Sequence, residues 1–434
     1  MKKGYNLMLK KVIKDAFPTV LAFTMSGMYS VVDGMFVGRA AGDTGLAAIN
    51  IAWPIPALIT ALGIGIGTGG SVLYSHYRGC GEKQTCKELL ECTITLLTGC
   101  GIGIIPVLFL IQIPFLELLG ASGTIQAEAV KYTTIIIAGS MFQVAGTGMM
   151  PVLRNKNHSL GAMLCMAAGF AVNLTVNYIL MFRYNLGIQG AAFGTVAAQA
   201  VVVILSCMVL WKTGCRSWKV LCKWKYVANI FKIGITAFGT SLAPTAALIF
   251  TNLQCLRYGG NAAVACYAVI SYIVFPVQYF LTGIGEGIQP LLSFYYGAKK
   301  KEEVQEIKKI AYTAEIVLGI AAAAVTVWMT PYLGSWFGLS QESNTYFSSG
   351  MRISAAAFLL MGTAKLNVSC LNAVMKTKKA IFMTYIESLV VSPLCLLLLP
   401  GLGNMNGIWL ALPATAGIMT GIYGLIRKDR QHEK

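Results

Sequence analysis

The chain has 434 residues, of which 56% are hydrophobic and 12% are charged, and its mean hydropathy is +0.66. The charged share is about half that of soluble domains, which excludes an ordinary water-soluble globular protein. The formal net charge of +17 alone would fit a nucleic-acid or acidic-lipid partner. The positions of the cations along the chain favour membrane topology instead.

Apolar segments long enough to span a membrane recur along the whole chain. A spanning helix needs roughly 20 mainly apolar residues. Twelve segments meet this condition: 16–38, 46–75, 92–115, 131–153, 160–182, 187–211, 229–256, 262–294, 310–337, 345–373, 380–400 and 405–426. The sequence therefore predicts an all-α integral membrane protein with twelve transmembrane helices.

A glycine motif shows that the chain consists of two copies of one unit. Gly65-Ile66-Gly67-Thr68-Gly69 returns 218 positions later as Gly283-Ile284-Gly285-Glu286-Gly287, and Gly42 aligns with Gly260. The polar connection at about 212–228 lies at the midpoint and is the predicted linker. We expect two pseudo-symmetric six-helix lobes, residues 1–218 and 219–434, related by an axis along the membrane normal. Such repeats are typical of secondary transporters.

Basic residues gather on one side of the predicted membrane. Of the 34 Lys and Arg, 28 fall in the terminal segments and the connections on the N-terminal side. The other side holds Arg39, Lys131, Arg183, Arg257 and Arg352, and Lys365 lies within a span. By the positive-inside rule, both termini and the linker are cytoplasmic, in a multi-pass protein of the cytoplasmic membrane.

Polar residues within the spans are the candidate functional groups, because ionisable side chains are costly there and usually functional. Met25, Tyr29 and Asp33 recur at intervals of four and share one helical face. The same spacing joins Gln278, Thr282 and Glu286 in the eighth span, and Asn173 with Asn177 in the fifth. Lys365 is the intramembrane cation of the tenth span. Hydrogen bonding between helices is the alternative role, above all for Gln278 and Thr282.

Three segments together resemble a known transporter family. They are Val31–Arg39 followed by Gly45–Asn50, Leu186–Ala192, and Gly283–Pro290 with Tyr296–Ala298. They resemble the multidrug and toxic compound extrusion (MATE) family, in its bacterial drug-exporter branch. The resemblance implies two six-helix lobes forming a V with a cavity in each lobe. It also implies export of organic cations in exchange for protons or sodium ions.

The resemblance assigns an ion-coupling site to the N-terminal half. Asp33, Asn173 and Thr195 match the family's residues, whereas Asn177 stands where many members have aspartate. Asp33 is then expected to hold a proton, or to bind sodium with the oxygens of Asn173, Asn177 and Thr195. Met25, Tyr29, Gln278, Thr282, Glu286 and Lys365 are the candidates for the substrate cavity and the second lobe. Whether Glu286 and Lys365 interact stays open.

No cofactor is expected apart from the coupling ion, and the expected protein is a monomer that binds organic cations and lipid but no nucleic acid. A transporter of an anionic lipid-linked or metabolite substrate is the alternative, although it would need several cavity cations and Lys365 is the clear candidate. An enzyme is disfavoured because His76, His158 and His432 all lie at or near cytoplasmic ends, away from the bilayer core.

Overall fold

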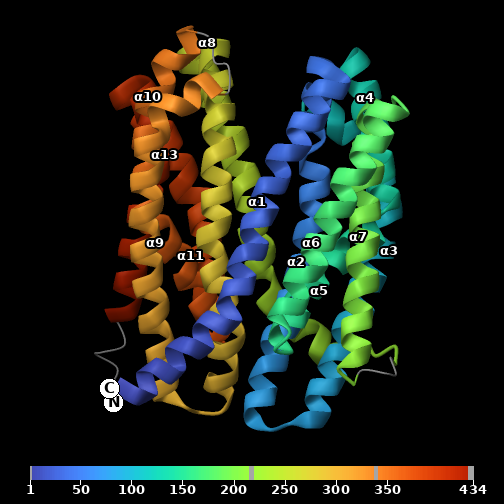
Figure 1. Cartoon of the computed structure of the whole chain (residues 1–434), viewed down its shortest axis with the longest axis vertical. Helices are drawn as coiled ribbons and strands as arrows, with labels where there is room; N and C mark the ends of the chain where they lie inside the picture. The colour runs from blue at the N-terminus through green and yellow to red at the C-terminus, as the bar shows by residue number, and fades with distance from the viewer. Residues whose placement is uncertain (1, 215–218, 337–340, 429–434) are drawn as a thin grey trace. The chain divides into compact units, whose positions relative to one another are not determined.

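The computed structural model describes residues 2–214, 219–336 and 341–428, and helices account for nearly all of them (Figure 1). In chain order they are α1 (Lys2–Ala52), α2 (Pro54–Cys80), α3 (Lys83–Leu118), α4 (Gly123–Ala138), α5 (Ser140–Asn155), α6 (Ser159–Tyr178), η1 (Ile179–Arg183), α7 (Gly187–Lys212), α8 (Trp224–Gly297), α9 (Lys301–Trp336), α10 (Gln341–Ala356), α11 (Phe358–Ala373), α12 (Thr377–Ile386), η2 (Glu387–Val391) and α13 (Ser392–Lys428). The segments η1 and η2 are single π-helical turns.

The helices account for all twelve predicted spans. Nine helices in the described part of the chain are long and apolar enough to cross a membrane, or eleven if each of two bent pairs counts as one span. The longest, Thr377–Ile426, has non-helical backbone at Gly403 and Asn404. This break falls between the predicted spans 380–400 and 405–426. Counting its two parts separately gives twelve spans, so the predicted all-helical membrane fold is confirmed.

The 218-residue repeat is visible in the backbone. Gly42 has φ 61° and ψ −159°, and Gly260 has φ 62° and ψ −158°. Only glycine adopts this region readily, since a Cβ would clash with the backbone. The pairs Gly81 with Lys299 and Asn157 with Met375 also have positive φ at the same spacing. The repeat inferred from the glycine motif is thus a repeat of chain geometry as well.

Contacts between helices divide the chain into two compact units that are interleaved in sequence. Unit 1 comprises Met1–Gly27, Ala243–Leu292 and Lys301–Lys434, and unit 2 comprises Met28–Leu242 and Ser293–Lys300. The helices α1 and α8 therefore each contribute to both units. The division into lobes at residue 218 follows from the sequence repeat and stays a prediction.

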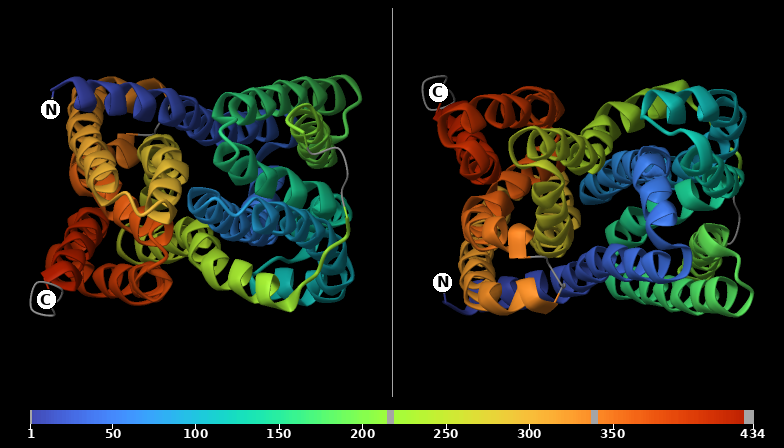
Figure 2. Two further views of the ribbon diagram at one scale, coloured as in Figure 1. Left: turned by 90° about the horizontal axis from the view of Figure 1, so that it is seen from below. Right: turned by 90° about the horizontal axis from the view of Figure 1, so that it is seen from above.

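Each unit is a bundle of closely packed helices, which Figure 2 shows end-on. In unit 2, α6 packs along α7, and α2 packs against both α3 and α5. In unit 1, α9 and α13 each pack against α10 and α11.

The glycine motif of α2 lets two other helices of unit 2 approach it closely. A methyl group at Gly67 would clash with the backbone of Gly148 on α5, and one at Gly69 would clash with the carbonyl oxygen of Ile230 on α8. Side-chain-free faces of this kind allow helix backbones to come into contact. The motif of α2 is therefore a site of close helix packing.

The second copy of the motif does the same in unit 1. A Cβ at Gly283 would lie 2.8 Å from Cα of Val20, and one at Gly287 would lie 2.7 Å from Cα of Ala16. Both contacts are with the first half of α1. Each motif therefore packs against the first span of the other repeat copy, which is why the compact units are interleaved in sequence.

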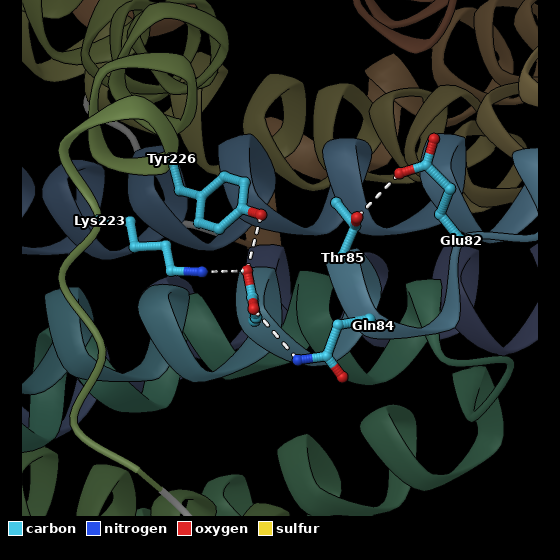
Figure 3. A network of polar contacts seen from close by, with 6 residues as sticks. Glu82, Gln84, Thr85, Lys223 and Tyr226 are labelled. Atoms are coloured by element: carbon cyan, nitrogen blue, oxygen red, sulfur yellow. Dashed lines mark hydrogen bonds and ion pairs between the residues drawn. The ribbon is translucent and has the colours of Figure 1, made fainter.

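The end of the linker is fastened to α3 within unit 2. Figure 3 shows Lys223 and Tyr226 converging on a carboxylate, which belongs to Glu88. Lys223 Nζ lies 2.7 Å and Tyr226 Oη 2.8 Å from Oε2 of Glu88, and Gln84 Nε2 donates to Oε1 at 3.1 Å. These contacts fix the start of α8 beside α3.

The charge distribution predicts the orientation of this fold in the membrane. In a background without the native cysteines, we expect Lys219→Cys to resist a membrane-impermeant maleimide added to intact cells and to react in inside-out vesicles. Position 219 is exposed, so access alone does not limit the reaction. Arg183→Cys, also exposed and predicted to face outward, is the control that should react in intact cells. Labelling of position 219 from outside would overturn the topology.

Candidate functional site

A carboxylate and two carboxamides meet inside unit 2. Asn177 Nδ2 donates to Oδ1 of Asp33 at 2.6 Å and to Oδ1 of Asn173 at 3.0 Å. Asp33 comes from α1, and the asparagines lie one turn apart on α6, where side chains four residues apart share a face. Both asparagines are fully buried and Asp33 is half-buried. Asp33 and Asn177, both expected in the ion-coupling site, are therefore joined by a direct hydrogen bond.

Two hydroxyl groups extend this network. Asn173 Nδ2 donates to Oη of Tyr29 at 2.9 Å, and Oη of Tyr29 lies 3.1 Å from Oγ1 of Thr195. Thr195 in turn donates to the carbonyl oxygen of Ala191 at 3.0 Å. Because the threonine proton is used there, Tyr29 donates to Thr195. The four predicted ion-coupling residues thus belong to one continuous hydrogen-bond chain, and Tyr29 links them.

One oxygen of this network lacks a partner. Oδ1 of Asn177 is buried and accepts no hydrogen bond from the described residues, and it lies against Gly194, where any side chain would clash with it. An unsatisfied buried acceptor costs about 1–3 kcal/mol. The position fits a bound proton donor or a hard cation, since such cations prefer carboxylate, carbonyl and hydroxyl oxygens.

Tyr132 is a member of this neighbourhood that the sequence did not reveal. Its side chain on α4 is buried, and it interacts electrostatically with Asp33. Tyr132 stands at the start of a predicted span, where a tyrosine is ordinarily read as an interface residue. Its distance from Asp33 along the chain left no spacing signal.

A second polar site lies inside unit 1. A cavity of about 110 Å³ is lined by Gln278, Lys365 and Glu387, among other residues. Lys365 Nζ lies 2.7 Å from Oε1 of Glu387, and the two side chains are only 10% and 17% exposed. A buried pair of this kind is costly to break, by about 3–5 kcal/mol when one partner is removed. The structure thus adds Glu387 to the predicted site residue Lys365.

The structure places the remaining predicted residues at different points. Gln278 and Lys365 meet at the unit 1 cavity, whereas Glu286 accepts a hydrogen bond from Ser369 Oγ at 3.3 Å. Thr282 is half-buried on α8 between Gln278 and Glu286. Met25 is half-buried in the part of α1 that belongs to unit 1, while Tyr29 and Asp33 belong to unit 2. Lys365 forms an ion pair with Glu387.

The chain is similar in sequence to known transporters over most of its length. The family profile described as MatE matches residues 18–179 and 237–397. The chain is 23% identical over 414 residues to the Multidrug export protein MepA of Staphylococcus aureus (strain NCTC 8325 / PS 47), with 93% of this chain and 90% of that protein covered.

Two solved structures are similar over nearly their whole length. The Vibrio cholerae MATE transporter VcmN has a TM-score of 0.90 at 20% identity, with 100% of this chain and 99% of that chain covered. A MOP superfamily transporter from Pyrococcus furiosus has a TM-score of 0.89 at 19% identity, with 98% and 96% covered, and a binding pocket whose reverse polarity suggests a different function for that protein.

These observations define a class of protein. A multi-pass helical fold with an internal repeat and polar groups enclosed within each unit is the architecture of a secondary transporter. The chain belongs to the MatE family, whose profile matches well over half of its residues. Members of this family are transporters, and the predicted family membership is confirmed.

Glu286 is expected to contribute to transport from unit 1. Glu286→Gln keeps the acceptor for Ser369 but removes the ionisable group, so transport should fall while the protein stays folded. Ser369→Ala is the matched control, because it removes the hydrogen bond and keeps the carboxyl group. Efflux rates in proteoliposomes and thermal unfolding of the same preparations test this. Unchanged efflux and ion dependence in Glu286→Gln would assign Glu286 to structural hydrogen bonding.

Proposed function

We propose that this chain is a secondary active antiporter that exports organic cations across the cytoplasmic membrane in exchange for protons or sodium ions. The observation that carries the proposal is the hydrogen-bond chain through Asp33, Asn177, Asn173, Tyr29 and Thr195. In this proposal Asp33 holds the coupling ion, the protein acts as a monomer, and it needs no cofactor and no nucleic acid.

Competition for one carboxylate provides the coupling. In apolar surroundings a carboxyl group favours its neutral, protonated form, whereas a bound organic cation favours the ionised form. Proton and cationic substrate therefore oppose each other's binding at Asp33, and by linkage each weakens the other equally. Two ligands that exclude each other at one site, in a protein that exposes the site alternately to each side, exchange across the membrane.

The network supports either coupling ion, for different reasons. A proton needs only Asp33, which is the single carboxylate among the residues that form the chain of hydrogen bonds. A sodium ion would use Asp33 together with the partnerless Oδ1 of Asn177 and neighbouring neutral oxygens. One carboxylate attracts sodium less strongly than two, so the asparagine at 177 favours proton coupling.

Aromatic side chains near Asp33 suit a lipophilic organic cation. The ring centroids of Tyr29 and Phe170 lie 5.9 Å apart, and those of Phe36 and Phe182 lie 5.7 Å apart, both edge to face. Tyr29 and Phe36 flank Asp33 on α1 by one turn each. Aromatic faces attract organic cations, and they adapt to different shapes without directional hydrogen bonds.

A transporter of an anionic lipid-linked or metabolite substrate is the alternative. It would need cavity cations available to the substrate, and the intramembrane cation that the sequence offered is Lys365. Because Lys365 is paired with Glu387, a simple anion would have to replace a carboxylate already in place. The pairing disfavours this alternative.

Efflux of ethidium from proteoliposomes tests the proposal directly. Proton and sodium gradients are imposed separately, in the orientation that drives export. We expect one gradient to accelerate ethidium movement and the other to leave it unchanged. No acceleration by either gradient, in vesicles where the protein is shown to be folded, would contradict antiport of organic cations.

Exchanging the two polar groups tests the role of Asp33. Asp33→Asn should lower gradient-driven efflux by about tenfold or more, because an amide neither takes up a proton nor supplies a charge. The double variant Asp33→Asn with Asn177→Asp restores one carboxylate at position 177, whose side-chain nitrogen lies 2.6 Å from Oδ1 of Asp33 in the wild-type protein. It should recover part of the loss.

The outcomes of this exchange are distinct. Full efflux in Asp33→Asn alone would remove Asp33 from the coupling mechanism. No recovery in the folded double variant would leave Asp33 essential and would show that the carboxylate cannot act from position 177. Asn177→Asp alone provides the comparison with two carboxylates.

A further inference from the structure

The cavity of unit 1 occupies the position in the repeat that the Asp33 network occupies in unit 2. Ala247 and Thr251 are 218 residues from Tyr29 and Asp33, and both line the cavity. Leu412 also lines it and corresponds to Thr195 with the one-residue slip seen between Gly190 and Gly407. The two units therefore enclose equivalent sites with different chemistry.

The unit 1 site carries charges of both signs. Lys365 and Glu387 form an ion pair at 2.7 Å beside the cavity, and both are largely buried. A ligand with a single charge would pair with one of them and leave the other buried without compensation, which is strongly unfavourable. A ligand with both charges would replace the Lys365–Glu387 pair with two ion pairs, one between its carboxylate and Lys365 and one between its ammonium group and Glu387. The charge pattern of the site thus selects zwitterions.

Two further polar groups in the cavity lining lack partners. Nε1 of Trp409 and Oγ1 of Thr415 are buried and make no hydrogen bond with the described residues. The indole N–H can only donate, and the threonine hydroxyl can donate as well. Both atoms are enclosed by protein packing, with the indole nitrogen against Gly350, so the ammonium of Lys365 is the group that pairs with a carboxylate.

The size and the remaining lining restrict the ligand. The cavity volume of about 110 Å³ is below the roughly 300–1,000 Å³ of sites for drug-sized ligands. Its apolar wall includes Ile270, Val274, Met361 and Leu396. The small volume of this apolar cavity fits a compact aliphatic group rather than a large ring system.

From these observations we infer that the unit 1 cavity is a binding site for a small zwitterion of amino-acid type with an apolar side group. The ligand carboxylate pairs with Lys365, and its ammonium group pairs with Glu387. This site is separate from the Asp33 network and does not depend on the proposed efflux function.

Three probes with one aliphatic body test the charge requirement. L-leucine carries both charges, 3-methylbutylamine lacks the carboxylate, and 4-methylpentanoate lacks the ammonium group. Equilibrium dialysis with the purified full-length protein in nanodiscs should show that leucine binds about tenfold or more tighter than either analogue. Equal binding of the three probes, or no binding of leucine, would overturn the inference.

Substitutions at the ion pair should shift this preference in opposite directions. Lys365→Met leaves Glu387 alone and should make 3-methylbutylamine the preferred probe, while Glu387→Gln should favour 4-methylpentanoate. If a single variant does not fold, Lys365→Met with Glu387→Gln removes both charges and avoids a lone buried ion. That double variant should lose all preference for leucine, and a preference retained in it would contradict the inference.

Two controls separate this site from other effects. Glu88→Gln removes the ion pair with Lys223 in unit 2 and should leave leucine binding unchanged. Asp33→Asn should lose ethidium efflux and still bind leucine. Failure of ethidium efflux in the wild-type protein with leucine binding intact would reject the proposed function alone, and the reverse result would reject this site alone.

Discussion

Close contact between helix backbones at the two glycine motifs is the constraint on which the rest of this structure depends. At Gly67 and Gly69 in unit 2, and at Gly283 and Gly287 in unit 1, a methyl group would overlap a neighbouring backbone. In a membrane the hydrophobic effect does not drive helices together, so close van der Waals packing must supply much of the attraction. The glycines permit this packing, and they place α1 and α8 so that each belongs to both units.

Packing at these motifs also determines where polar groups can be placed. The first part of α1 belongs to unit 1 and the rest to unit 2, so residues on successive turns of this helix can belong to different units. On α1, Met25 belongs to unit 1, whereas Tyr29 and Asp33 join the network of unit 2. The stripe of polar and polarizable residues read from the sequence is therefore shared between two environments.

The buried carboxylates of the two polar sites have different partners. Unit 2 surrounds one carboxylate with carboxamides and hydroxyls and leaves an oxygen of Asn177 without a partner. At its cavity, unit 1 compensates the carboxylate of Glu387 with Lys365. An uncompensated carboxylate can exchange its partner for a proton or a cation, while a compensated pair offers one charge of each sign to a ligand. The repeat preserved the backbone and allowed the chemistry of the two sites to diverge.

The sequence by itself determined the helical membrane fold, the repeat and most members of the first site. The length of the apolar segments and the 218-residue glycine pattern are signals within the sequence itself, so they need no tertiary structure to be recognised. Asp33, Asn173, Asn177 and Thr195 were identified by spacing and by resemblance to the MATE family. Only the tertiary structure showed that Tyr29 joins them, that Tyr132 lies in the same electrostatic environment, and that Lys365 pairs with Glu387. These relations connect residues on different helices, and the distance between two helices depends on packing that no spacing along one helix records.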